Sequence, residues 1–142
     1  MPPQDLTDAN SPDNLSGGLV GAVATLTLFG GDVIAAQTNL VVASVLAPFD
    51  LIPLSLEVCQ RAIAGGTPTV GLFNSTDSTN IFANVNTGAT GVPVRTSTQV
   101  STNLVVQQND VMQLRVTTGA GVTMTGVQVV LTYLSTGDPA NR

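Results

Sequence analysis

The chain has 142 residues, enough for one domain with its own hydrophobic core, and only 9% of them are charged, against roughly 25% in ordinary domains. It contains no histidine, lysine or tryptophan, which excludes Ser-His-Asp and Cys-His catalysis, histidine metal centres and lysine-dependent chemistry. The formal net charge is −5 and the few arginines are scattered, so we expect neither a nucleic-acid nor a membrane partner. We also expect no enzymatic activity and no cofactor.

The low charge predicts that the protein associates with other molecules. Hydrophobic residues make up 43% of it, and a surface with few charges is prone to associate at apolar patches and sheet edges. We therefore expect part of the surface to be covered by other copies or by a larger body. The polar positions hold mainly threonine, serine, asparagine and glutamine, a composition typical of strands and turns.

Residues 1–18 are predicted to form an N-terminal arm, either flexible or bound to a partner. They hold three prolines and three aspartates, end in Gly-Gly and show no hydrophobic period. They lack the features of a secretory signal peptide, so synthesis in the cytoplasm without export is expected. The glycosylation patterns at Asn14 and Asn74 are then chance matches. Residues 19–142 are predicted to form a single β-sandwich domain.

The domain begins with two predicted strands. Residues 19–29 are apolar but shorter than the ~20 residues of a membrane span, so they predict a strand, or a strap against a partner. The Gly-Gly-Asp of residues 30–32 is expected to end it. Residues 39–46 are rich in β-branched side chains, which favours a strand over a short helix.

The next segment is divided by prolines and glycines. Pro48 and Pro53 are expected to interrupt the chain, and residues 54–59 then alternate apolar and polar side chains as a strand does. Glycines at 65–66 predict a turn, and residues 67–73 predict a strand that starts with an edge proline.

Polar loops separate the remaining central strands. Residues 74–80 are a run of turn formers, and residues 81–85 predict a short strand. The loop of residues 88–93 leads to another strand within residues 96–106, and Asn109-Asp110 turns the chain.

Residues 110–135 predict a closing hairpin, two strands that face each other across a glycine-marked bend. The apolar faces of these strands are Met112, Leu114 and Val116 in the first, and Val127, Val129, Leu131 and Tyr133 in the second. Gly126 predicts a bulge or a close backbone approach.

The whole pattern is one of seven to nine strands at intervals of about 8 to 15 residues, with no convincing helix. The predicted fold class is all-β, an antiparallel β-sandwich or jelly roll with an extended N-terminal arm.

Candidate chemistry is sparse. Asp50 and Glu57 are the one pair of carboxylates that could act together, as in glycoside hydrolysis, but Glu57 fits a solvated or arginine-paired strand residue better. Cys59 is the single cysteine, so it forms no internal disulfide, and its apolar surroundings predict a small buried hydrophobe.

Calcium bound by oxygen ligands is the one metal option left. Asn74, Asp77 and Asn80 share a loop, and Asn109-Asp110 is a second candidate. Turn formation explains both groups more simply, so we assign no metal, catalytic or cofactor residue.

Sugar-binding sandwiches usually present flat aromatic rings on their surface. The aromatic residues of this chain are Phe29, Phe49, Phe73, Phe82 and Tyr133. Most lie in apolar runs, which predicts core packing, and a glycan-binding module would depend on a loop aromatic such as Phe73 or Phe82.

Residues 45–135 carry a family resemblance in the runs TPTVGLFNS, NIFANVNTG and VVQQNDVMQLRVTTGAGVTMTGVQVVLTYL. They resemble small jelly-roll proteins on the virion surface of tailed bacteriophages, in which an Asp-led strand and Thr-Gly turn precede a Gly-led closing strand. The pattern is carried by Asp110, Leu114, Val116, Thr117, Thr118 and Gly119, and then by Gly126, Val127, Val129 and Leu131. Asn109 stands where glycine is common and Met112 where leucine is common.

The resemblance implies a capsid decoration (cement) protein that binds the outside of a phage head and bridges its major capsid protein subunits. Such proteins are often trimers at local three-fold positions, so a homotrimer is favoured. The arm and residues 19–29 would contact neighbouring subunits, and the loops at 74–80 and 88–93 would face the capsid or the solvent. The alternatives are a tail, fibre or receptor- and glycan-binding module, and a self-assembling shell protein. The acidic arm argues against a coat protein that packages its own genome.

Overall fold

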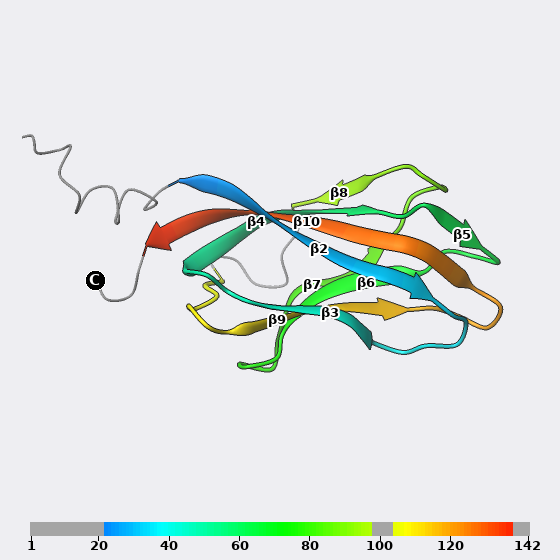
Figure 1. The fold of residues 1–142 in the computed structure, drawn as a ribbon, viewed down its shortest axis with the longest axis horizontal. Coiled ribbons are helices and arrows are strands. Elements are labelled where there is room, and N and C mark those ends of the chain that lie inside the picture. The colour runs from blue at the N-terminus through cyan, green and yellow to red at the C-terminus, as the bar shows by residue number, and fades with distance from the viewer. Residues whose placement is uncertain (1–21, 98–103, 138–142) are drawn as a thin grey trace, which may run out of the picture.

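The computed structural model describes residues 22–97 and 104–137, which form two layers of β-strands (Figure 1). The strands are β2 (Val23–Val33), β3 (Leu40–Leu46), β4 (Asp50–Cys59), β5 (Ala62–Ala64), β6 (Thr69–Asn74), β7 (Thr79–Asn86), β8 (Val94–Thr96), β9 (Val111–Thr117) and β10 (Thr123–Gly137). The predicted arm, residues 1–18, lies outside the described residues. Within the two described ranges, no helix has the length and apolar character to cross a membrane.

The strand order is that of a jelly roll. The first sheet has the strand order β2-β10-β4-β8, with β5 also paired with β10, and the second sheet has the order β3-β9-β6-β7. The chain forms four antiparallel strand pairs: β2 with β10, β3 with β9, β4 with β8 and β6 with β7. The pairings of β10 with β4 and of β9 with β6 join these pairs into two sheets. The predicted antiparallel β-sandwich is confirmed.

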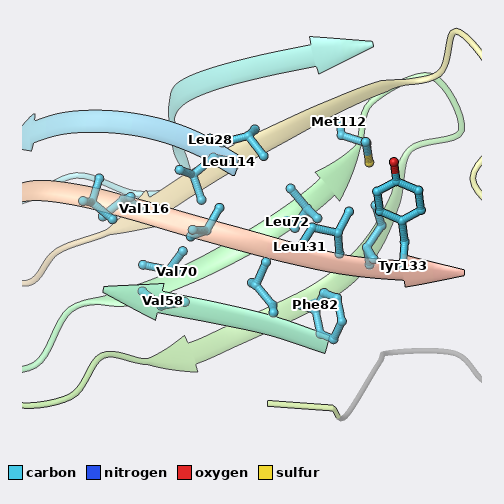
Figure 2. Close-up of a cluster of buried hydrophobic side chains, with 14 of the residues drawn as sticks. Leu28, Val58, Val70, Leu72, Phe82, Met112, Leu114, Val116, Leu131 and Tyr133 are labelled. Carbon is cyan, nitrogen blue, oxygen red and sulfur yellow. The ribbon is translucent and has the colours of Figure 1, made fainter. Parts of the chain in front are cut away.

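Alternate side chains of both sheets fill the space between them (Figure 2). The two rows predicted from residues 110–135 all point inward: Met112, Leu114, Val116, Val127, Val129 and Leu131 are 0 to 1% exposed, and Tyr133 is 6% exposed. Leu72 of β6 and Phe82 of β7 meet them from neighbouring strands and are 0% exposed. The core thus comes from the period-two pattern of the chain.

The predicted closing hairpin is wrong. β9 lies in the second sheet and β10 in the first, and residues 118–122 carry the chain from one layer to the other (Figure 1). Both strands have one fully apolar face, and the two faces meet across the core. Alternation indicates which side of a strand is buried, but not which sheet the strand joins.

The predicted bulge at Gly126 is confirmed, and it corrects the predicted end of the first strand. Gly126 has φ 66, and the register between β10 and β2 shifts on both sides of Val127. β2 does not stop at residues 30–32 but continues to Val33, because Val33 still pairs with Met124 beyond the bulge. The Gly126 N–H of the bulge donates to Asp32 Oδ1 at 2.8 Å.

Pro53 does not interrupt the chain as predicted but lies inside β4, opposite Tyr133. The described pairs of β8 with β4 run from Leu56 to Val58, and residues 98–103, which follow β8 in the chain, lie outside the described ranges. A register shift follows Pro53, which leaves Leu54 half-buried and Ser55 buried, one step out of the predicted alternation.

The other predicted strands are present at nearly the predicted places, as β3, β6 and β7. The strand predicted within residues 96–106 is only partly described, because residues 98–103 lie outside the described ranges. Thr96 ends β8, and Val106 forms an isolated bridge with Leu51.

Candidate interaction surface

The outward-facing side of the β2-β10-β4 sheet is unusually poor in charge. Residues opposite each other in an antiparallel pair share a face, so the register aligns Val23 with Leu134 and Ile52, and Phe29 with Gln128 and Cys59. We call this surface the apolar outer face. It consists of Val23, Thr25, Thr27 and Phe29 of β2, Gln128, Val130, Thr132 and Leu134 of β10, and Ile52, Ser55, Glu57 and Cys59 of β4. Glu57 is the only charged residue among them, and Arg95 of β8, opposite Glu57, adds one cation at the border of this face, where its Nε and Nη2 donate to Ser55 Oγ at 3.3 and 3.1 Å.

Large hydrophobic side chains on this face remain in water. Phe29 is 71% exposed and Val23 is 63% exposed, while Ile52, Val130 and Leu134 are half-buried by their neighbours. Covering Phe29 and Val23 would gain about 1–2 kcal/mol each. Val23, Leu134 and Ile52 form an apolar row at one end of the face and Phe29 and Cys59 lie at the other, with mostly small polar side chains between them. Exposed apolar side chains gathered on one face are typical of an interaction surface.

The surface continues around one side of the sandwich, where β2 and β3 form the edges of their two sheets. A Cβ on Gly30 would lie 2.5 Å from Val42 Cγ2, so the two edge strands are in close contact there. This β2–β3 side carries four more exposed hydrophobic side chains: Ile34 at 70%, Leu46 at 55%, Val41 at 41% and Leu40 at 37%.

Edge strands usually carry charges or prolines that prevent pairing with another chain. Between residues 22 and 46 the single charged side chain is Asp32, and its carboxylate already accepts from Gly126 N–H. The apolar outer face and the β2–β3 side adjoin each other along β2, and this edge lacks the charges and prolines that usually prevent pairing with another chain.

The structure brings three of the candidate calcium ligands together. Asn74 Nδ2 donates to Asp110 Oδ2 at 2.9 Å and to Asp77 Oδ2 at 3.4 Å, which joins the two loops that were predicted separately. Asn80 is instead opposite Phe73 in the second sheet, and Asn109 is an exposed turn residue with φ 71.

The orientation of the Asn74 amide explains this cluster without a cation. Its Oδ1 accepts from the backbone N–H groups of Thr76 at 3.1 Å and Asp77 at 3.2 Å, so the NH₂ group must face the carboxylates. The Asn74 NH₂ group thus donates to both carboxylates, and within the described residues no group of three or more histidines, cysteines or acids could hold a metal ion. The network joins the β6–β7 turn to the start of β9.

The two acids considered for catalysis are not brought together. Asp50 is fully buried at the start of β4, where its Oδ1 accepts from Gln108 N–H at 2.8 Å. Glu57 is exposed seven positions along the same strand, a separation of about 23 Å at 3.3 Å per residue. Cys59 is not the buried hydrophobe that was predicted, because it lies half-exposed on the apolar outer face.

The aromatic residues divide between core and surface. Phe82 and Tyr133 are buried, as predicted for core packing, so Phe82 cannot serve as a surface platform. Phe29 is the exception, since most of its ring is exposed on β2. Phe73 is half-exposed, and the Arg115 guanidinium lies 3.7 Å from its ring centroid. Sequence reasoning missed Arg115, because Phe73, the ring it stacks on, comes from the neighbouring strand β6.

Comparison with known proteins finds likeness only among solved structures. No family model and no curated protein matches the chain. A chain in the structure "Capsid of Ralstonia phage GP4" is similar, with a TM-score of 0.50 and 19% identity over 82% of this chain and 86% of that chain. A chain in "Cyanophage Pam1 capsid asymmetric unit" gives a TM-score of 0.47 and 18% identity over 80% of this chain and 85% of that chain. The Ralstonia phage likeness shows a shared fold.

Proposed function

We propose that this protein is a structural component of a phage virion, a decoration (cement) protein that binds the outside of the head and bridges its capsid subunits. The fold supports this context, because a similar sandwich occurs in the capsid of Ralstonia phage GP4. The aligned part covers nearly the same share of both chains, 82% and 86%, so the two are of similar length.

The observation that carries the proposal is the uncovered apolar surface on β2, β3, β10 and β4. A free protein with Phe29 at 71% and Ile34 at 70% exposure, and almost no charge nearby, is prone to associate. Binding to a larger body would bury these side chains, which prevents unspecific association and stabilises the complex.

The proposed mechanism is physical rather than chemical. A protein that binds only the intact shell stabilises it by mass action, and added buried area raises the barrier to losing a subunit. The favoured assembly is a homotrimer that contacts the major capsid protein. β2 and the acidic arm of residues 1–18 make the inter-subunit contacts, and the protein has no enzymatic, nucleic-acid or membrane role. It is made in the host cytoplasm and is located on the capsid exterior.

The test uses heads of the encoding phage from which this gene has been deleted. Purified protein should co-sediment with these heads and raise the temperature at which they release DNA. Phe29→Arg and Thr132→Arg place a cation on the apolar outer face and should weaken binding by roughly 30-fold or more, as for a residue central to an interface. Asn86→Arg is the matched control, because Asn86 is exposed on the second sheet, opposite Thr69.

All three variants should keep the melting temperature of the unmodified protein, since each replaces an outward-facing side chain. Light scattering then separates the alternatives: a discrete trimer supports decoration, whereas large closed particles formed by the protein alone support a self-assembling shell. Heads that neither bind the protein nor gain heat resistance would overturn the proposal.

A further inference from the structure

A pocket of about 190 Å³ opens on the second sheet, away from the apolar outer face. Its floor is at Gly71 of β6, which lies opposite Arg115 of β9. On the other side of Gly71 the backbone of β7 bulges at Ala83 and Asn84: a Cβ on Gly71 would lie 3.1 Å from the Phe82 carbonyl oxygen. The missing side chain of Gly71 thus creates the depression.

Arg115 is the one charged residue that lines the pocket, and its guanidinium is held in place. Nε and Nη2 donate to Gln113 Oε1 at 3.1 and 2.7 Å, and the group stacks on Phe73 at 3.7 Å from the ring centroid. Among the described residues, none forms an ion pair with Arg115. The guanidinium therefore keeps unused N–H donors in a fixed orientation, which suits a carboxylate ligand.

The rest of the lining can both donate and accept hydrogen bonds. Asn39, Asn80 and Asn84 contribute amides, and Thr69 and Thr117 contribute hydroxyl groups. Within the described residues, the side chains of Asn80 and Asn84 make no hydrogen bond.

Backbone conformation is also unusual at this pocket. Asn39 has φ 49 and Asn84 has φ 54, and such positive values are uncommon for residues other than glycine. Strained backbone gathers at ligand sites more often than elsewhere. The irregular register near Asn84 also disfavours the addition of a peptide as a further strand along β7.

We propose that this pocket binds a single sugar residue that carries a carboxylate, of the uronic-acid type. The carboxylate pairs with Arg115, and the ring hydroxyls pair with the amides of Asn80 and Asn84. The volume is below the roughly 300–1,000 Å³ of pockets for larger ligands, so one ring binds weakly and several copies in one assembly supply avidity.

The pocket and the apolar outer face lie on opposite sides of the sandwich, because they belong to the outer faces of its two sheets. If the proposed function holds, a protein seated by its apolar outer face presents the pocket to the surroundings of the virion. Only this orientation rests on the proposed function, since sugar binding is a property of the isolated protein.

The experiment is an NMR titration of the full chain, ¹⁵N-labelled, with glucuronate. Saturable shifts should centre on Gly71, Asn84 and Arg115, and glucose and acetate, which each lack one half of the ligand, should bind at least about tenfold more weakly. Arg115→Gln should lower glucuronate affinity by about tenfold or more, and Arg95→Gln, on the other sheet, should leave it unchanged.

Asn84→Gly provides a second variant that keeps the fold, because glycine accepts φ 54 without strain. It removes one amide and should weaken glucuronate binding several-fold. Absence of saturable shifts, or equal binding by Arg115→Gln, would overturn the site, and equal binding of acetate would overturn the sugar class. These results leave the head-binding test unaffected, so the two proposals fail separately.

Discussion

Replacing Asn74 with aspartate tests the buried network that joins the β6–β7 turn to β9. Asn74 is 1% exposed and donates to Asp110 Oδ2 at 2.9 Å, while its Oδ1 accepts two backbone N–H groups. Asn74→Asp keeps the shape and both accepted bonds, but it turns the donor toward Asp110 into a second carboxylate oxygen.

The expected cost follows from these distances. A lost hydrogen bond to a charged acceptor costs about 1.5–3 kcal/mol. Two like charges about 3 Å apart repel by roughly 6 kcal/mol at an effective dielectric constant of 20, and proton uptake or small movements relieve part of this. We expect a total loss of about 3–5 kcal/mol, which lowers the melting temperature by about 10–20 °C.

The assay is thermal and urea unfolding followed by circular dichroism, with and without calcium. Asn74→Ala should cost about 2–3 kcal/mol, less than Asn74→Asp, because it adds no charge. Asp77→Ala should change stability by about 0.5 kcal/mol, since Asp77 is exposed and its bond to Asn74 is long at 3.4 Å. Calcium and EDTA should leave the unmodified protein unchanged. An Asn74→Asp protein as stable as the original, or a calcium-dependent rise in the original, would refute the reasoning.

Two further predictions concern the strand that pairs in the middle of the first sheet. Leu131→Ala should destabilise the protein by about 2–5 kcal/mol in urea unfolding, because Leu131 is 0% exposed, whereas Val130→Ala next to it should cost no more than about 1 kcal/mol. Equal losses would mean that β10 is buried on both faces. Gly126→Ala should cost about 1 kcal/mol or more, because φ 66 disfavours a side chain and the new Cβ would lie 3.2 Å from Arg61 Cβ. A neutral or stabilising result in the same assay would show that the bulge relaxes freely.

The sequence alone determined the fold class and the inward face of most strands. Val127, Val129 and Leu131 alternate with less apolar residues, and the period of two places them on one side whatever the strand pairs with. Gly126 and the turn formers of residues 74–80 likewise marked their positions, because positive φ and Asx turns depend on local chemistry.

The tertiary structure decided which strands are neighbours, and the candidate sites followed from that. β9 and β10 share a turn but not a sheet, because their apolar faces pack against each other across the core rather than side by side. Pro53 lies within β4 because β10 pairs with this strand on both sides of it, a pairing that the local sequence does not show. The pocket at Arg115 and the bond from Asn74 to Asp110 join strands and loops far apart in sequence. The apolar outer face also follows only from the tertiary structure. Alternation shows that a side chain points outward, but only the packed sheets show that nothing in the described chain covers it.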